Sequence, residues 1–219
     1  MTNRETWALR AAACELLAFS FRYPTLELAQ AVVSGEWAEA AEEVAAALGL
    51  DLPGSFAADA RANAVEAPDV LLRALRAEAT RLFVGSPDPT VSPYEGVWRA
   101  ADDGVQALLF VNPHSMAVER FCKSCGLGRP EGTNEPLDHA ATELELLQYL
   151  AMLEARIAQP AEGGPAPEDL PGGSAAAAYE RFMAEHVLTW MPRFADSVVE
   201  RSRIPFYLAA TALLKAYLA

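Results

Sequence analysis

Acidic and basic side chains gather in the stretch NEPLDHAATELE, residues 134–145. His139 and Glu143 are four residues apart, so on a helix they share one face and point toward the same place. A pair of this kind can form a helix-terminal salt bridge, act as an acid and a base, or supply two ligands to a metal ion. Glu135 and Asp138 add negative charge at the expected helix start, where the helix dipole favours ionised carboxylates. The stretch therefore predicts a recognition site, a metal site or a structural pair.

The sequence CKSC, with Cys122 and Cys125, is the second candidate. Such a pair is typical of thioredoxin-like redox sites, which require a strand leading into a helix, or of half a zinc site. Zinc would need two further ligands, and His114, His139 and Cys14 do not have the paired spacing of known zinc sites. We expect the pair to lie at an ordinary helix end, with no metal bound.

The element that must position the first candidate is a helix that begins at Pro136, because a proline tolerates the first helical turn. Ala140, Leu144, Leu147 and Ala151 then recur at helical spacing and predict one apolar face. The composition favours helix over strand throughout, so we predict an all-α bundle of about ten helices. The expected helices cover residues 3–22, 25–35, 37–48, 56–65, 68–84, 113–126, 136–159, 174–194 and the chain from 205 onward.

Two proline-rich stretches divide this helical pattern. The segment GSPDPTVSP, residues 85–93, cannot hold a helix, and Tyr94 and Trp98 follow it as the expected wall of a binding groove. The second stretch predicts a flexible linker at residues 159–173. We expect a larger N-terminal helical subdomain, residues 1–133, and a smaller part, residues 134–219, made of a hinge loop and C-terminal helices.

The charge balance is 17 basic against 30 acidic residues, a net charge of −13. A surface this acidic repels nucleic acid and anionic lipid, whereas it attracts cationic peptides or simply keeps the protein in solution. The amino end resembles no signal peptide, and no apolar run approaches the ~20 residues of a membrane span. Three cysteines without disulfide spacing also suit a reducing compartment, so we expect a cytoplasmic protein without membrane insertion.

Four segments in order resemble the TorD/DmsD family of chaperones for molybdenum-containing redox enzymes. They are RLFVGSPDPTVSPYEGVW, NEPLDHAATELELLQYL, EHVLTWMPRF and PFYLAA, and they span residues 81–208. The resemblance implies a cytoplasmic all-α protein that is no enzyme and carries no cofactor. Its partners would be the twin-arginine leader and the apo form of a molybdopterin-containing oxidoreductase of the dimethyl-sulfoxide or trimethylamine-oxide reductase type. The chaperone would assist cofactor insertion and delay export.

Carried over by motif, the resemblance implies a peptide-binding site that comprises Tyr94, Trp98, Glu135, Pro136, Asp138, His139 and Glu143. Arginine pairs best with planar carboxylates, so Asp138 and Glu135 are the candidates for contacting the two leader arginines. Tyr94 and Trp98 would add cation–π contacts or cover the apolar part of the leader, unless they are core residues.

Two alternatives stay open at this point. One is a helical metalloenzyme that uses His139, Glu143 and the CKSC pair. The other is a peptide-binding adaptor without redox clients. The chain lacks the glycine-rich phosphate loop, the nucleophile elbow and the metalloprotease motif, which lowers the expectation of an enzyme. The resemblance also implies either a monomer or a homodimer that exchanges its carboxy-terminal helices.

Overall fold

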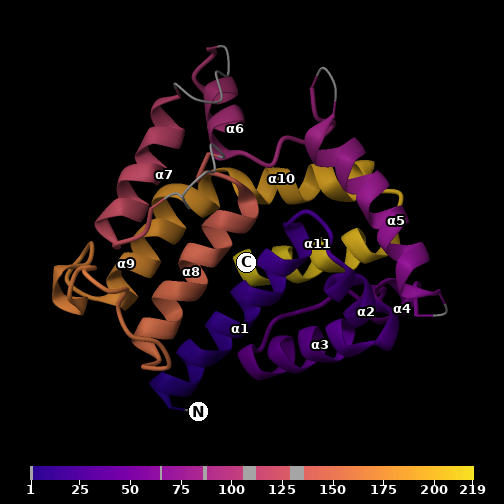
Figure 1. Cartoon of the computed structure of the whole chain (residues 1–219), viewed down its shortest axis with the longest axis horizontal. Helices are drawn as coiled ribbons and strands as arrows, with labels where there is room; N and C mark the ends of the chain where they lie inside the picture. Colours follow the sequence, from indigo (N-terminus) through magenta and orange to yellow (C-terminus); the bar gives the residue numbers. More distant parts are fainter. Residues whose placement is uncertain (1, 65, 86–87, 106–111, 129–135) are drawn as a thin grey trace. The chain divides into compact units, whose positions relative to one another are not determined.

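Helices form the regular structure of the chain in a computed structural model that describes residues 2–64, 66–85, 88–105, 112–128 and 136–219 (Figure 1). The α-helices are α1 (Asn3–Phe21), α2 (Leu26–Ser34), α3 (Glu36–Leu48), α4 (Phe56–Arg61), α5 (Pro68–Ala79), α6 (Glu95–Asp102), α7 (Pro113–Ser124), α8 (Ala140–Glu154), α9 (Ala175–Phe182), α10 (Leu188–Arg201) and α11 (Pro205–Leu218). Two π-helical turns, η1 (Thr80–Val84) and η3 (Met183–Val187), and one 3₁₀ turn, η2 (Pro167–Asp169), accompany them. The all-α prediction is confirmed.

The chain forms two compact units, each assembled from separate segments. The first unit contains Met1–Cys14 and Tyr94–Met191, and the second contains Glu15–Pro93 and Pro192–Ala219. The boundary that we predicted between residues 133 and 134 falls inside the first unit, because contacts join segments on both sides of it. The hinge role of the segment that begins at residue 134 stays a prediction.

Several helices begin where the sequence predicted. Thr25 and Ser174 are N-caps whose side chains accept hydrogen bonds from the backbone N–H groups of the first turn, and Asn112 does the same for α7. Pro205 opens α11, where a missing N–H costs nothing. These residues satisfy the free N–H groups of a helix start, so they fix the starts of these helices in the sequence.

The core of the second unit forms around Trp37, where α11 packs against α4 and α2 packs against α5. The Trp37 ring lies 5.1 Å from the Phe206 ring in an edge-to-face contact, and its indole N–H donates a 3.0 Å hydrogen bond to Ser20. Both rings are fully buried. Burial of aromatic area with the polar N–H satisfied makes this contact a main stabiliser of the unit.

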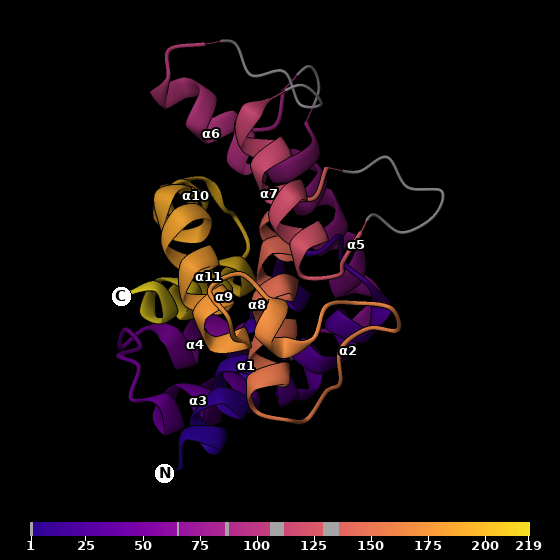
Figure 2. The same cartoon turned by 90° about the vertical axis from the view of Figure 1, so that its left-hand side faces the viewer.

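In the first unit, α8 packs beside α9, and α6 packs beside α7 (Figure 2). Trp7 of α1 contacts Tyr179 of α9 with ring centres 5.1 Å apart. The segment that joins α8 to α9 contains the predicted linker, residues 159–173, and it is not solely a surface feature. Its Leu170 is only 3% exposed, so we expect removal of this segment to cost stability.

Helix α8 begins four residues later than predicted, at Ala140 rather than at Pro136. His139 has an extended backbone (φ −76°, ψ 139°), and its ring Nδ1 accepts a 3.1 Å hydrogen bond from the N–H of Ala141. His139 is therefore the N-cap, a place more often taken by Ser, Thr, Asp or Asn. Pro136 lies buried in the turn that precedes the helix.

Candidate functional site

The two motif segments that the sequence singled out lie against each other in the first unit. The backbone N–H of Glu95 donates a 3.0 Å hydrogen bond to the carbonyl of Asp138. Tyr94 and His139 form an isolated antiparallel bridge, and their rings meet edge to face with centroids 5.3 Å apart. Residues 93–98 and 136–139 thus form one continuous site, which we call the motif junction.

Asp138 bonds several neighbours of the motif junction. Its carboxylate Oδ2 accepts hydrogen bonds from the Gly96 N–H at 2.9 Å and from the Ser115 hydroxyl at 2.6 Å. The amide of Asn112 completes this arrangement by donating to the carbonyl of Gly96 at 2.6 Å. Asp138 therefore joins the start of α6 to the start of α7.

The other carboxylate oxygen of Asp138, Oδ1, has no hydrogen-bond partner among the residues that the structure describes. Only 1% of the residue is exposed, and this burial raises the pKa of Asp138, an effect that the bonds from Ser115 and Gly96 oppose. The expectation that Asp138 lies in the first helical turn is therefore wrong. It precedes the helix, and its surroundings disfavour the charge.

Beneath the motif junction lies a buried cluster that we call the carboxyl cluster. Glu143 is fully buried, and its Oε2 accepts a 3.0 Å hydrogen bond from the indole N–H of Trp190. Glu95 is also buried, with Oε2 at 2.9 Å from Nδ1 of His186 and Oε1 at 3.3 Å from the guanidinium of Arg99. Arg99 compensates the charge of Glu95 and His186 bonds it, whereas no cation among the described residues bonds Glu143.

Burial and the nearby charge of Glu95 raise the pKa of Glu143 well above its usual range. Oε1 of an ionised Glu143 has no hydrogen-bond partner. A proton on this carboxyl removes the charge and lets Glu143 donate to the side chain of Glu95. The surroundings of Glu143 thus favour its protonated form.

His139 and Glu143 do not bond each other, although they are four residues apart. His139 caps α8 through Nδ1, and burial lowers its pKa to about 4, so its ring is neutral at physiological pH. Glu143 turns instead to Trp190. The salt bridge that the spacing suggested is absent because each side chain serves another partner.

The remaining predicted site residues differ in how they are placed. Tyr94 and Trp98 are partly exposed, with Tyr94 at the bridge to His139 and Trp98 one helical turn further along α6. Pro136 is buried, and Glu135 lies outside the described residues. The structure therefore brings Tyr94, Asp138 and His139 together, whereas Glu143 lies in the buried carboxyl cluster.

The CKSC pair lies at the carboxyl end of α7, as expected, and both thiols are buried. Burial raises the pKa of Cys122 to about 12 and that of Cys125 to about 11, so neither is the thiolate that metal binding or redox chemistry requires. Within the described residues, no three His, Cys, Asp or Glu side chains are arranged to hold a metal ion. The metalloenzyme alternative gains no support.

Three residues of this site were missed by sequence reasoning. Glu95 lies inside an aromatic segment, His186 lies 91 positions away from it, and Ser115 follows an ordinary helix start. His186 stacks on Phe182 and bonds Glu95. Residues this far apart in the sequence share no spacing pattern that links them. The only sequence signal was a charged residue, Glu95, in an otherwise apolar segment.

Comparison with known proteins adds to this geometry. A family model described as "Nitrate reductase delta subunit" matches residues 29–196. The chaperone protein TorD of Vibrio cholerae serotype O1 (strain M66-2) is 29% identical over 144 residues, which cover 66% of this chain and 59% of that protein. TorD of Aliivibrio fischeri (strain ATCC 700601 / ES114) is 26% identical over 156 residues, which cover 71% of this chain and 66% of that protein.

These matches assign the all-α chain to a protein family. The protein belongs to the nitrate reductase delta subunit family, the TorD/DmsD family predicted from its motifs. The relatives named above are chaperones, which favours a chaperone over an enzyme. The chain spans about three-fifths of the length of the Vibrio relative. None of the described helices is long and apolar enough to cross a membrane.

Proposed function

We propose that this protein is a cytoplasmic chaperone for a molybdopterin-containing oxidoreductase of the dimethyl-sulfoxide or trimethylamine-oxide reductase type. It binds the twin-arginine leader and the apo form of the catalytic subunit, assists cofactor insertion and delays export. The observation that carries the proposal is the motif junction, where Tyr94 and His139 meet above the buried Asp138. The TorD names of the relatives agree with a chaperone.

The chemistry of the motif junction suits an arginine-containing peptide. Asp138 keeps one carboxylate oxygen, Oδ1, without a partner, and a guanidinium offers several N–H donors in a plane. Tyr94 and Trp98 are partly exposed aromatic rings, which attract cations over their faces and cover apolar side chains. The net charge of −13 further favours the approach of a cationic leader.

Because Asp138 is only 1% exposed, leader binding in this proposal requires a local opening of the motif junction. An arriving guanidinium then favours the ionised carboxylate that burial disfavours, since an opposite charge lowers the pKa of a carboxyl. Glu135 is the proposed partner of the second arginine. Pro136 and His139 shape the turn that presents these groups, and Glu143 supports them from below.

Titration calorimetry of the full chain with a twin-arginine leader peptide tests the proposal. We expect a micromolar or lower dissociation constant, with affinity at least about ten-fold weaker when both arginines are lysines, because lysine lacks the bidentate geometry. Asp138→Asn should weaken binding similarly, and it retains an oxygen that accepts from Ser115 and Gly96.

Asp69→Asn is the matched control, because Asp69 is an exposed carboxylate on α5 whose one ion pair within the described residues is with Arg73 of the same helix. It should bind the leader with unchanged affinity. If the folded protein binds no leader, or binds the lysine peptide equally well, the proposed function is wrong. Light scattering of the same samples then tells whether the protein is a monomer or a homodimer.

A further inference from the structure

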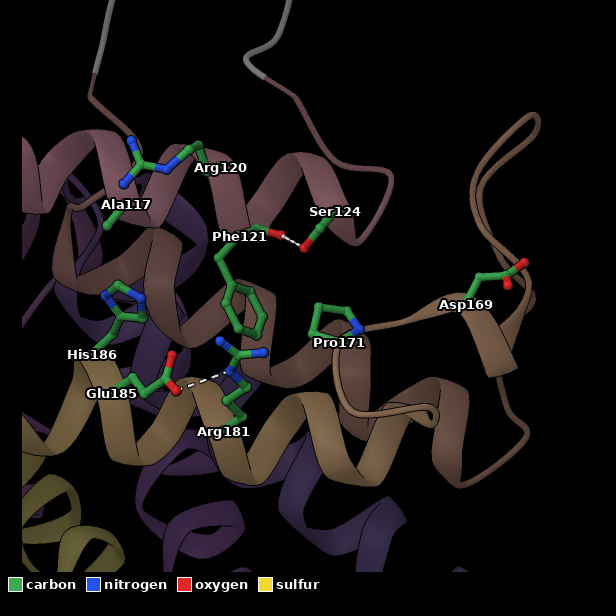
Figure 3. Close-up of a pocket in the computed structure, with 9 residues that line it drawn as sticks. All are labelled: Ala117, Arg120, Phe121, Ser124, Asp169, Pro171, Arg181, Glu185 and His186. Carbon is green, nitrogen blue, oxygen red and sulfur yellow. Dashed lines mark hydrogen bonds and ion pairs between the residues drawn. The ribbon is translucent and has the colours of Figure 1, made fainter.

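A pocket of about 440 Å³ opens in the first unit between α7 and the segment formed by α9 and η3 (Figure 3). Phe121 lies at its centre, and Pro171, from the segment that joins α8 to α9, lies beside it. The Phe121 ring packs against Phe182 with centroids 4.9 Å apart. The middle of the pocket is therefore an apolar surface formed by packed aromatic rings.

Charged groups surround this apolar centre. Arg120 is exposed on the α7 wall, and it has no ion pair or hydrogen bond with any other described residue. Arg181 on the facing wall bonds Glu185 at 2.9 Å, as Figure 3 shows. A guanidinium without an internal partner is free to bind a ligand, whereas Arg181 would first have to leave Glu185.

His186 supplies a second donor on the same pocket wall. Its Nδ1 is held by the buried carboxylate of Glu95 at 2.9 Å, which fixes the ring orientation. Its Nε2 has no hydrogen bond within the part of the chain that the structure describes. When both ring nitrogens carry protons, Nε2 can donate to an oxygen of a bound anion.

The acidic residues of the lining limit which anion fits. Asp169 and Glu185 both line the pocket, so a phosphate dianion would meet two negative charges. A single carboxylate carries half that charge and matches the planar guanidinium through two parallel hydrogen bonds. An aromatic or aliphatic body beside the carboxylate would cover Phe121 and Pro171.

We infer that this pocket docks a short segment of a partner protein in which an acidic residue stands beside an aromatic one. The carboxylate binds Arg120 and Nε2 of His186, and the aromatic ring packs on Phe121 and Pro171. The pocket is open at the surface, and charged groups of both signs surround its apolar centre. A peptide is the occupant because neighbouring side chains of one segment can supply a charged group and an apolar group together. The lining of this site includes none of the proposed leader contacts, although His186 bonds Glu95 of the motif junction.

Amide chemical shifts of the full chain, titrated with the blocked dipeptide acetyl-Glu-Phe-amide, test the inference. We expect saturable shifts in α7 and α9, with affinity roughly ten-fold weaker for Arg120→Ala, because a charge-assisted pair is lost. Lys123→Ala is the matched control, since Lys123 lies on the same helix, pairs with Glu119 and does not line the pocket. Acetyl-Lys-Phe-amide should bind far more weakly.

Three outcomes would overturn the inference. The first is the absence of saturable shifts, and the second is binding that Arg120→Ala leaves unchanged. The third is equal or tighter binding of 3-phenylpropionate or inorganic phosphate, which would make the pocket a site for a free organic acid or a general anion. None of these results bears on leader binding, so failure here and failure of the proposed function are separable.

Discussion

The indole N–H of Trp190 donates a 3.0 Å hydrogen bond to Oε2 of Glu143, and neither side chain is exposed to solvent. This bond joins α8 to the start of α10 inside the first unit. It also explains how a carboxyl with no cationic partner in the described part of the chain is held beside Glu95, which bonds His186 and forms an ion pair with Arg99. A neutral Glu143 donates its proton to Glu95 and accepts from Trp190, so all three groups are bonded.

Replacement of Glu143 tests whether it is a neutral acid. Glu143→Gln keeps an acceptor for Trp190 and gains an N–H donor for Glu95, so the free energy of unfolding should change by less than about 1 kcal/mol. Glu143→Ala leaves the indole N–H unpaired and opens a cavity, so it should cost about 2–4 kcal/mol. Urea unfolding followed by circular dichroism measures both. Equal destabilisation by the two variants would mean that the native carboxyl is ionised.

The pH dependence of stability follows from the same raised pKa of Glu143. The folded protein keeps the proton above the ordinary carboxyl pKa of 4.5, whereas the unfolded chain releases it. The folded state then binds more protons than the unfolded state, so this group lowers the free energy of unfolding as pH rises above 4.5. Glu143→Gln should remove this decline in urea unfolding at a series of pH values. An unchanged pH profile in the variant would contradict the shared proton.

His139 should act in the opposite direction. Its pKa is lowered to about 4 by burial, whereas the unfolded value is near 6.5, so between these pH values the unfolded chain binds more protons. His139 therefore contributes to stability above pH 6.5, and that contribution is lost as pH falls toward 4. His139→Asn keeps an N-cap acceptor and cannot titrate, so its stability should fall less steeply over this window. A parallel fall in both proteins, measured by urea unfolding, would show that the ring is protonated in the folded state.

Much of the fold could be predicted from the sequence, because local chemistry marks helix ends. Thr25, Asn112, Ser174 and Pro205 each satisfy or remove the free N–H groups of a helix start, and α2, α7, α9 and α11 begin beside or at them. The start of α8 was misplaced because Pro136 is a common first residue of a helix, whereas a histidine cap is a weak signal. We recognised no sequence signal for the π-helical turns η1 and η3.

The candidate site was only partly predictable, because its key bonds join distant segments. The sequence indicated Asp138 and Tyr94 through their motifs, yet the carboxyl cluster depends on Glu95 meeting His186 and on Glu143 meeting Trp190, which lie 91 and 47 positions apart. Spacing arguments apply to neighbours on one helix, so they paired His139 with Glu143. Tertiary packing gave each of these residues a different partner.

Gly96 should be essential to the packing of the motif junction, since a side chain there has no room. A Cβ at this position would meet the Ser115 hydroxyl and would lie 2.9 Å from Oδ2 of Asp138. Alanine gains ~1 kcal/mol of helix propensity, but overpacking costs about 1–3 kcal/mol, so Gly96→Ala should lose roughly 1 kcal/mol of stability. Gly54→Ala is the control, because nothing lies within 4 Å of a Cβ there, and it should be neutral or slightly stabilising.

A second substitution shows whether the loss in Gly96→Ala arises from the contact with Ser115. Ser115→Ala alone removes a hydrogen bond to Asp138 and should cost about 1 kcal/mol. In the double variant the hydroxyl that obstructs the new methyl group is gone, so the combined loss should be smaller than the sum of the two single losses. Urea unfolding of the four proteins gives this coupling free energy. Additive losses would mean that the Gly96 side of α6 has room for a methyl group, and that Asp138 is not held as tightly as the structure indicates.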